Sequence, residues 1–274
     1  MAGPLQGLRA RLRQVPLVAY LYHRLRESLA GGGPVDTRHG FRFAGDAAMQ
    51  AGDFEAEELA LVRKLLGEYG VLVDIGANLG LYTCTARSLG RRAIAVEPLP
   101  ANLRLLRANL AANGWSDTEI AEVGLAAEEG AAELFGTGTG ASLVQGWATL
   151  PQRTLLRHSI RLTTLDALLG ERFVGERLLI KADIEGAELG MLRGAQRTLE
   201  RSPAPAWLVE ICLTENFPGG VNPDYAATFE QFFARGYTAR TANAAARPVT
   251  REDVVHWAAQ GHADSGSYNY LFSK

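Results

Sequence analysis

The fold of this chain is decided by the stretch Val71-Leu-Val-Asp-Ile-Gly-Ala-Asn-Leu-Gly-Leu-Tyr-Thr83. Apolar residues lead into an acid, Asp74, and then Gly76, Asn78 and Gly80 follow at alternate positions before a helical apolar pattern begins. This order predicts a buried strand, a tight turn and the first turn of a helix. Glycines let the backbone approach a ligand closely, and the helix start offers unpaired N–H groups. We therefore expect a ligand at this turn.

The spacing of the turn restricts the class of ligand. A dinucleotide site needs G-x-G-x-x-G and a P-loop ends in Gly-Lys-Ser or Gly-Lys-Thr, whereas this turn has D-x-G-x-N-x-G. An acid at the strand tip repels phosphate but suits a cationic amino group. We therefore predict S-adenosylmethionine (SAM) as the cofactor. A nicotinamide-dependent oxidoreductase is disfavoured because the third glycine is missing.

Length and composition bound the class of protein. The chain has 274 residues, 47% of them hydrophobic, which is enough for one sizeable core, and its net charge of −2 does not suggest a nucleic-acid partner. Cys84 and Cys212 fall in predicted core elements and indicate reduced thiols of a cytoplasmic protein. No apolar run reaches the roughly 20 residues that span a bilayer, and no metal-ligand spacing of Cys and His is present.

Residues 1–33 differ from the rest of the chain. Leucines recur there at three- or four-residue steps with arginines between them, and a Gly-Gly-Gly-Pro sequence at 31–34 ends the pattern. We predict an amphipathic helical appendage with a glycine linker, followed by one domain over residues 34–274. The appendage is expected to pack on its own domain or on a second copy in a homo-oligomer. Contact with an anionic membrane surface is the weaker alternative.

Downstream of the glycine turn, short apolar strands alternate with helical patterns. The predicted strands cover residues 93–96, 120–125, 160–164, 178–180, 207–209, 237–241 and 267–272. The alternation predicts a doubly wound α/β fold with a mostly parallel, seven-stranded sheet and helices on both faces. The last two strands have no clear helix between them and predict a C-terminal antiparallel hairpin, as in the methyltransferase variant of the Rossmann-like sheet.

Acids end several of the predicted strands. Asp74, Glu97, Asp183 and Glu210 each stand at such an end, and in open α/β sheets ligands bind at the carboxyl ends of the strands. So many acids suit a sulfonium and ribose hydroxyls better than a polyphosphate. Glu97 follows Asp74 by 23 residues, close to the roughly 20-residue offset of a ribose-binding acid. The Gly-, Ala- and Thr-rich stretch 128–150 fits a surface hairpin and a loop over the ligand equally well.

With these features the chain resembles the FkbM family of SAM-dependent methyltransferases. The matching segments, in family order, are Val73-Asp-Ile-Gly-Ala-Asn-Leu-Gly-Leu-Tyr-Thr83, Val96-Glu-Pro98, Leu103-x-x-Leu-x-x-Asn109, Thr164-Leu-Asp166, Ile180-Lys-Ala-Asp-Ile-Glu-Gly-Ala-Glu188, Leu192-Arg-Gly-Ala195 and Val209-Glu-Ile211. The run that ends at Glu188 is the most specific. The resemblance implies a class I methyltransferase that acts on a hydroxyl of a sugar or secondary metabolite.

The resemblance also implies roles for single residues. The methionine part of SAM would lie on Asp74, Gly76, Asn78 and Gly80, and Glu97 would bind the ribose. Because the acceptor hydroxyl loses a proton as it attacks, we expect a general base at the reacting methyl group. Asp183 is the first choice for this base and Glu210 is its rival. For Glu185 and Glu188, a direct role in the site and a role in stabilising the start of the following helix are equally plausible. Lys181 is expected to form an ion pair with one of the acids.

Other functions stay open. A divalent metal on Asp183 and a neighbouring acid would orient a diol, although no metal site is assigned. A SAM-binding or scaffolding module without activity, acting beside a glycosyltransferase, is the alternative from another class. The acceptor is expected to be a small molecule or a saccharide. Base methylation of nucleic acid is disfavoured, because Asp183-Ile-Glu-Gly stands where an Asn-Pro-Pro-Tyr motif would be. His158 and His262 are predicted in loops from which they could reach the site, although a lone loop histidine is more often simply solvated.

Overall fold

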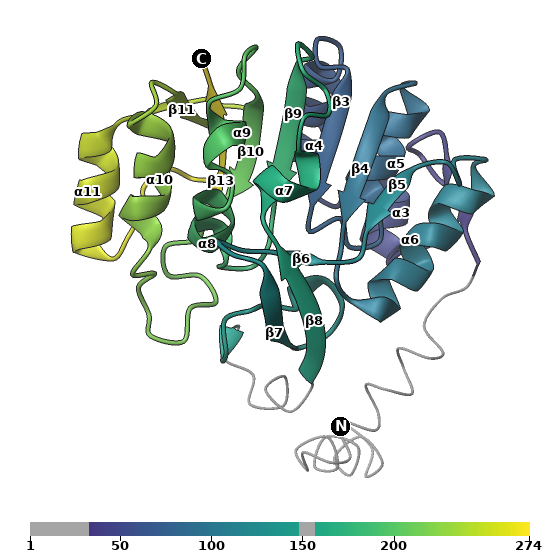
Figure 1. The fold of residues 1–274 in the computed structure, drawn as a ribbon, viewed down its shortest axis with the longest axis horizontal. Coiled ribbons are helices and arrows are strands. Elements are labelled where there is room, and N and C mark those ends of the chain that lie inside the picture. The colour runs from purple at the N-terminus through teal and green to yellow at the C-terminus, as the bar shows by residue number, and fades with distance from the viewer. Residues whose placement is uncertain (1–32, 148–156) are drawn as a thin grey trace, which may run out of the picture.

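The computed structural model describes residues 33–147 and 157–274 (Figure 1). Within them, the largest sheet has eight strands. From one edge to the other these are β12 (Pro248–Val249), β11 (Thr238–Thr241), β13 (Asn269–Ser273), β10 (Ala206–Glu210), β9 (Leu178–Ala182), β3 (Val71–Ile75), β4 (Arg92–Val96) and β5 (Glu119–Ala121). The run from β10 to β5 is parallel, and β12, β11 and β13 pair antiparallel.

Helices cover both faces of this sheet because its central strands are apolar on both sides. Side chains alternate along β3, so Val71 and Val73 join one buried cluster and Leu72 joins the other. The first cluster is completed by α7 (Leu165–Leu169), α8 (Glu188–Arg193), α9 (Gln196–Leu199), α10 (Tyr225–Phe233) and α11 (Arg251–Gln260). The second is completed by α3 (Ala47–Ala51), α4 (Ala56–Leu65), α5 (Leu81–Ser88) and α6 (Pro100–Ala112). The predicted doubly wound α/β fold is confirmed.

Two small sheets complete the fold. One is a hairpin of β1 (Val35–Asp36) and β2 (Arg42–Phe43). The other has three strands, in the order β6 (Gly124–Leu125), β8 (Arg157–Thr163) and β7 (Gly130–Phe135), and it lies below the main sheet in Figure 1. Its residues Leu134 and Ile160 line the same cleft as Ile75 and Val96, at the carboxyl ends of β3 and β4. This sheet therefore forms a wall over the edge where ligands are expected.

The C-terminal part of the sheet departs from the prediction. The expected count of seven strands is wrong, since the described residues place eight in the main sheet. β11 and β13 do pair antiparallel, but they are not a hairpin, because β12 and α11 lie between them in the sequence. Helix α11 starts with a capping box between Thr250 and Asp253 and buries only Val254 and Trp257. Two buried residues are too few to give the sequence a clear helical periodicity, although the capping pair is recognisable in the sequence.

Close contacts at two glycines set further element boundaries. The predicted strand 120–125 becomes β5 and β6 in two different sheets, and Gly124 packs against Leu162 of the small sheet. Helices α8 and α9 are separated at Gly194, where a Cβ atom would overlap the carbonyl oxygen of Ala126. Tertiary neighbours, which the local pattern does not contain, set both boundaries.

Residues 1–32, which carry most of the predicted N-terminal appendage, lie outside the described residues. The proposed division into residues 1–33 and 34–274 therefore stays a prediction. No helix in the described part of the chain is both long and apolar enough to cross a membrane.

Asn109 ties the N-terminal segment to the glycine turn. This fully buried side chain of α6 accepts a hydrogen bond from the Ala44 N–H at 2.6 Å and donates to the carbonyls of Ala44 at 3.1 Å and Leu79 at 2.9 Å. Asn113, one helical turn later, makes a similar pair of bonds to the backbone of Arg42, but at the surface. The motif position Asn109 thus serves the framework of the turn.

The Asn109→Ala variant is expected to lose about 2 to 4 kcal/mol of the free energy of unfolding, because its buried backbone partners are left unpaired. Asn113→Ala is the matched control and should lose less than about 1 kcal/mol, because water replaces its exposed bonds. Urea unfolding followed by circular dichroism measures both values. Equal losses in the two variants would contradict the role of burial.

Candidate functional site

The glycine turn after β3 is built by contact with the end of β9. Gly76 has a φ of +75°, and a Cβ atom there would overlap the carbonyl oxygen of Asp183. Only glycine fits both the backbone conformation and the space. Asn78 also has a positive φ, of +53°, and donates its backbone N–H to Glu97 Oε2 at 2.9 Å. The turn therefore joins the ends of β3, β4 and β9.

Asp74 and Gly80 support the turn, but they line neither of the two clefts beside it. Asp74 is fully buried, and its Oδ2 accepts from the Thr83 N–H at 2.9 Å and the Thr83 hydroxyl at 2.6 Å, so it holds the first turn of α5. Burial raises the pKa of Asp74. Its Oδ1 has no hydrogen-bond partner among the described residues. A Cβ atom on Gly80 would overlap Leu106 of α6, so glycine here lets the two helices approach.

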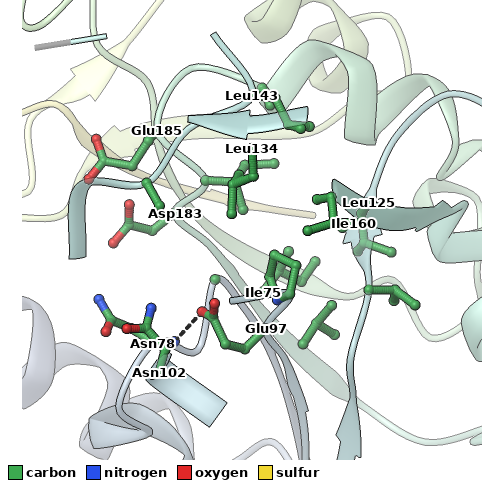
Figure 2. Close-up of a pocket in the computed structure, with 18 of the residues that line it drawn as sticks. Ile75, Asn78, Glu97, Asn102, Leu125, Leu134, Leu143, Ile160, Asp183 and Glu185 are labelled. Carbon is green, nitrogen blue, oxygen red and sulfur yellow. Dashed lines mark hydrogen bonds between the residues drawn. The ribbon is translucent and has the colours of Figure 1, made fainter. Parts of the chain in front are cut away.

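One cleft, which we call the Glu97 pocket, opens between the glycine turn and the small sheet. Apart from Glu97, Asn78 and Asn102, most of its wall is apolar and comes from both sheets, with Ile75, Val96, Leu125, Leu134, Leu143 and Ile160. Figure 2 shows Asp183 and Glu185 at one end of this pocket and Leu125 and Ile160 at the other. The pocket thus offers an apolar slot beside a carboxylate.

Glu97 is held rigidly in this pocket. Its side chain is 5% exposed, and its carboxylate accepts from the Asn78 N–H at 2.9 Å and the Leu99 N–H at 2.8 Å. Burial raises the pKa of Glu97 to about 7, although these backbone hydrogen bonds oppose the shift. The group therefore titrates close to neutral pH.

A second cleft, which we call the Asp183 pocket, adjoins the first and is lined by charged groups. Its ionisable residues are Glu55, Tyr82, Lys181, Asp183, Glu185 and Glu210. The two pockets share Gly76, Asn78, Thr139, Asp183 and Glu185, so they meet at the carboxyl ends of β3 and β9. The structure thus brings Gly76, Asn78, Asp183 and Glu210 together as predicted site residues, with Glu97 in the adjoining pocket.

The acids of the Asp183 pocket differ in their ion pairing and in their pKa values. Lys181 is 5% exposed and donates to Asp183 Oδ2 at 3.0 Å, which is the ion pair expected from the sequence. Burial lowers the pKa of Lys181, but the surrounding carboxylates, Asp183 first, outweigh burial and raise it overall. Burial and the neighbouring Asp183 and Glu185 raise the pKa of Glu210 to about 9. These surroundings therefore favour the protonated form of Glu210.

The segment before β8 packs on the loop that follows β9. The Trp147 indole N–H donates to the Glu185 carboxylate, and the Ser142 hydroxyl donates to the Glu185 carbonyl. Glu188 folds back to accept the Gly186 N–H at 3.0 Å, and burial raises the pKa of Glu188 to about 7. Glu188 thus serves the helix start, whereas Glu185 lines both pockets. The described part of stretch 128–150 has features of both interpretations: β7 pairs antiparallel with β8, and Gly138, Thr139, Ala141 and Leu143 line the Glu97 pocket.

Sequence reasoning missed Glu55 and Tyr82. Glu55 precedes α4 and reaches the Asp183 pocket, where it accepts the Tyr82 hydroxyl at 2.6 Å. Nothing in the linear pattern marks Glu55, but Tyr82 lies in the glycine stretch at the first turn of a helix that borders the site. A polar aromatic residue at that point was a usable signal.

Other candidates lie elsewhere. His158 is in β8, not in a loop, and His262 follows α11; neither lines the two pockets. The described residues contain no group of three or more His, Cys, Asp or Glu side chains arranged to hold a metal ion. Asn222 makes a turn before α10, with its Oδ1 accepting the Asp224 N–H at 2.8 Å. Cys84 and Cys212 are both buried free thiols.

The chain is similar to one protein family and to several solved structures. The model of the methyltransferase FkbM domain matches residues 74–239, more than half of the chain. Among solved structures, precorrin-6y C5,15-methyltransferase from Geobacter metallireducens GS-15 is 16% identical, with 72% of this chain and 79% of that chain covered and a TM-score of 0.41. Cofactor-bound Rv0187 from MTB is 16% identical, with 99% and 97% covered and a TM-score of 0.42. No protein with a curated description matches.

The Rossmann-like sheet and the domain match define the class of protein, which is a methyltransferase. The chain belongs to the FkbM methyltransferase family. The matched residues include Asp74, Glu97, Asp183 and Glu210, whereas Glu55 lies before them.

The Glu210→Gln variant should show how strongly the Asp183 pocket disfavours a second free carboxylate. A carboxyl group whose pKa is raised in the folded state binds more protons folded than unfolded, so its contribution to stability falls as pH rises between the unfolded value, near 4.5, and about 9. The free energy of unfolding of the wild type should fall relative to the variant by up to about 1.4 kcal/mol per pH unit over that window. Urea unfolding between pH 5.5 and 8.5 measures this difference.

Glu128→Gln is the control, because Glu128 is an exposed acid next to β7. Its stability should follow that of the wild type at every pH. A Glu210→Gln curve parallel to the wild type would show that Glu210 is ionised at neutral pH.

Proposed function

We propose that the protein transfers a methyl group from SAM to a hydroxyl group of a saccharide or small secondary metabolite. The observation that carries this proposal is the junction of two unlike pockets at Gly76, Asn78 and Asp183. One pocket is apolar with a buried carboxylate, and the other is lined with ionisable groups. A cofactor with a flat apolar base and a polar reacting end would place that end at the junction.

The residues of the first pocket fit SAM. The apolar wall suits adenine, and the buried Glu97 carboxylate suits the two ribose hydroxyls, which are hydrogen-bond donors. Gly76 lines both pockets, and Asn78 Oδ1 has no hydrogen-bond partner among the described residues. Gly76 and Asn78 would hold the methionine part directly, while Asp74 and Gly80 would support it by fixing the turn. When bound, SAM supplies an electrophilic methyl group.

The second pocket supplies the acid–base chemistry. Asp183 lies at the junction, with one carboxylate oxygen bonded to Lys181 and the side chain 23% exposed toward the cleft. It would accept the proton of the acceptor hydroxyl as the new O–C bond forms. Glu210, with a pKa raised to about 9 by burial, keeps its proton at neutral pH and would donate a hydrogen bond to the acceptor. Asp183 is therefore the base in this proposal.

SAM binding should weaken as pH falls through 7 in the wild type. Burial raises the pKa of Glu97 to about 7 without ligand. Two ribose hydroxyls can donate to both of its oxygens only in the deprotonated form, so binding at lower pH must first remove a proton. We expect the dissociation constant to rise about tenfold between pH 7.5 and 6. Isothermal titration calorimetry with SAM and with S-adenosylhomocysteine measures it.

Glu97→Gln should bind both ligands at least about tenfold more weakly at pH 7.5, and its affinity should lose most of this pH dependence. Any ionisation of the ligand is common to both proteins and cancels in the comparison. Unchanged affinity in Glu97→Gln would remove Glu97 from the cofactor site, and no binding by the wild type would remove SAM.

The acceptor can be found with methyl-deuterated SAM. Cell extracts incubated with the protein should gain a compound carrying a labelled methyl group on oxygen, detected by mass spectrometry. Asp183→Asn should bind SAM with the wild-type affinity but lower kcat by about 100-fold or more, since a positioned base contributes roughly that factor. Labelled product at an unchanged rate in Asp183→Asn would exclude Asp183 as the base, and a label on nitrogen or carbon would contradict a hydroxyl acceptor.

A further inference from the structure

A chain of contacts leads from the start of α4 to Asp183. The Tyr82 hydroxyl donates to Glu55 Oε2 at 2.6 Å, and the Lys181 ammonium lies 4.6 Å from the centre of the Tyr82 ring. Lys181 in turn donates to Asp183 Oδ2 at 3.0 Å. Three elements, α4, α5 and β9, thus meet around one buried ammonium group.

Glu55 adopts a conformation that its local sequence does not favour. It occupies the N-cap of α4 with a φ of +46°, and its side chain makes no capping bond to its own helix. Non-glycine residues rarely adopt a positive φ, and an N-cap side chain ordinarily stabilises the helix. Glu55, Asn78 and Glu185 are three of the six non-glycine residues with positive φ in the described chain, and all three line the Asp183 pocket. Such conformations concentrate at functional sites.

Lys181 faces more than one carboxylate. The ionisable groups around it and Asp183 come from five directions: Asp74 on β3, Glu55 before α4, Tyr82 on α5, Glu210 on β10, and Glu185 and Glu188 after β9. An ammonium bonded to a single carboxylate makes that carboxylate a weak base, because the positive charge favours its ionised form. A second carboxylate nearby offsets part of this effect.

We propose that Glu55, Tyr82 and Lys181 are positioning residues that orient Asp183 and set its strength as a base. This inference rests on the proposed function, in which Asp183 takes the acceptor proton. Lys181 fixes one Asp183 oxygen and leaves the other to receive the proton. Tyr82 holds Lys181 from its ring face, and Glu55 holds Tyr82 and tempers the charge of Lys181. Glu55 thereby belongs to the reaction site although it lies outside the matched family segment.

The test compares the pH dependence of kcat in two full-length variants, with the acceptor found by the labelling experiment. In Lys181→Met the loss of a positive charge should move the acid limb of the profile to higher pH, by about one pH unit or more. In Glu55→Gln the loss of a negative charge should move the same limb to lower pH, by a smaller amount. Opposite shifts are expected only if both residues act on the strength of the base.

Two further variants separate this effect from misfolding. Tyr82→Phe keeps the ring and every charge, so it should lower kcat but leave the acid limb in place. Lys181→Arg keeps the positive charge and should recover part of the rate lost in Lys181→Met. If Lys181→Met does not fold, the shift of the acid limb to lower pH in Glu55→Gln still tests the proposal. Lower kcat in Glu55→Gln with an unmoved acid limb, or shifts of the same sign in both variants, would overturn the proposal.

A measurement without turnover keeps this inference apart from the proposed function. The Asp183 carboxyl signal in carbon-13 NMR is assigned by its absence in Asp183→Asn, and its titration is followed in the protein without ligand. Lys181→Met and Glu55→Gln should move its midpoint in the same opposite directions. If they do and no methylated product forms, the proposed function fails while the coupling stands; if the midpoint stays fixed, the coupling fails.

Discussion

The contact between Gly76 and the carbonyl of Asp183 is the constraint on which the rest of the site depends. Because no side chain fits between them, the turn after β3 lies directly on the end of β9. That contact places the Asn78 backbone within reach of Glu97 and brings Asp183 to the boundary of two pockets. The ends of three parallel strands are thus fixed by backbone packing before any ligand arrives.

The Asp183 pocket contains more acidic than basic side chains. Within the Asp183 pocket, Lys181 is the basic residue among Glu55, Asp183, Glu185 and Glu210. The described acids differ in how they are accommodated. Asp183 is ion-paired, and Glu55 and Glu185 accept hydrogen bonds from Tyr82 and Trp147. Burial raises the pKa of Glu210 and so favours its neutral form. Burying several charges together is unfavourable, so the arrangement indicates selection for chemistry more than for stability.

The fold and much of the site were predictable from sequence because local pattern and tertiary position agree there. The apolar run of β3 and the glycine spacing identify the turn, and Glu97 and Asp183 follow from their places at strand ends. The framework role of Asp74 was not predictable, because strand-end acids that cap a helix and those that face a ligand look alike in sequence. Glu55 could not be found, since its importance rests on a contact with Tyr82, 27 residues away, and on a backbone angle. The breaks at Gly124 and Gly194 likewise depend on distant neighbours.

The three-stranded sheet has a consequence for how this enzyme can be altered. Leu134 and Ile160 form a small core with Leu99, separate from the two large clusters of the main sheet. Leu99, which lies between β4 and α6 and donates its N–H to Glu97, belongs to this small core. Leu125 of β6 belongs to the first large cluster of the main sheet. The outer wall of the Glu97 pocket is therefore packed against its floor. An exchange of Leu134 or Ile160 changes the packing beside Glu97 as well as the shape of the wall.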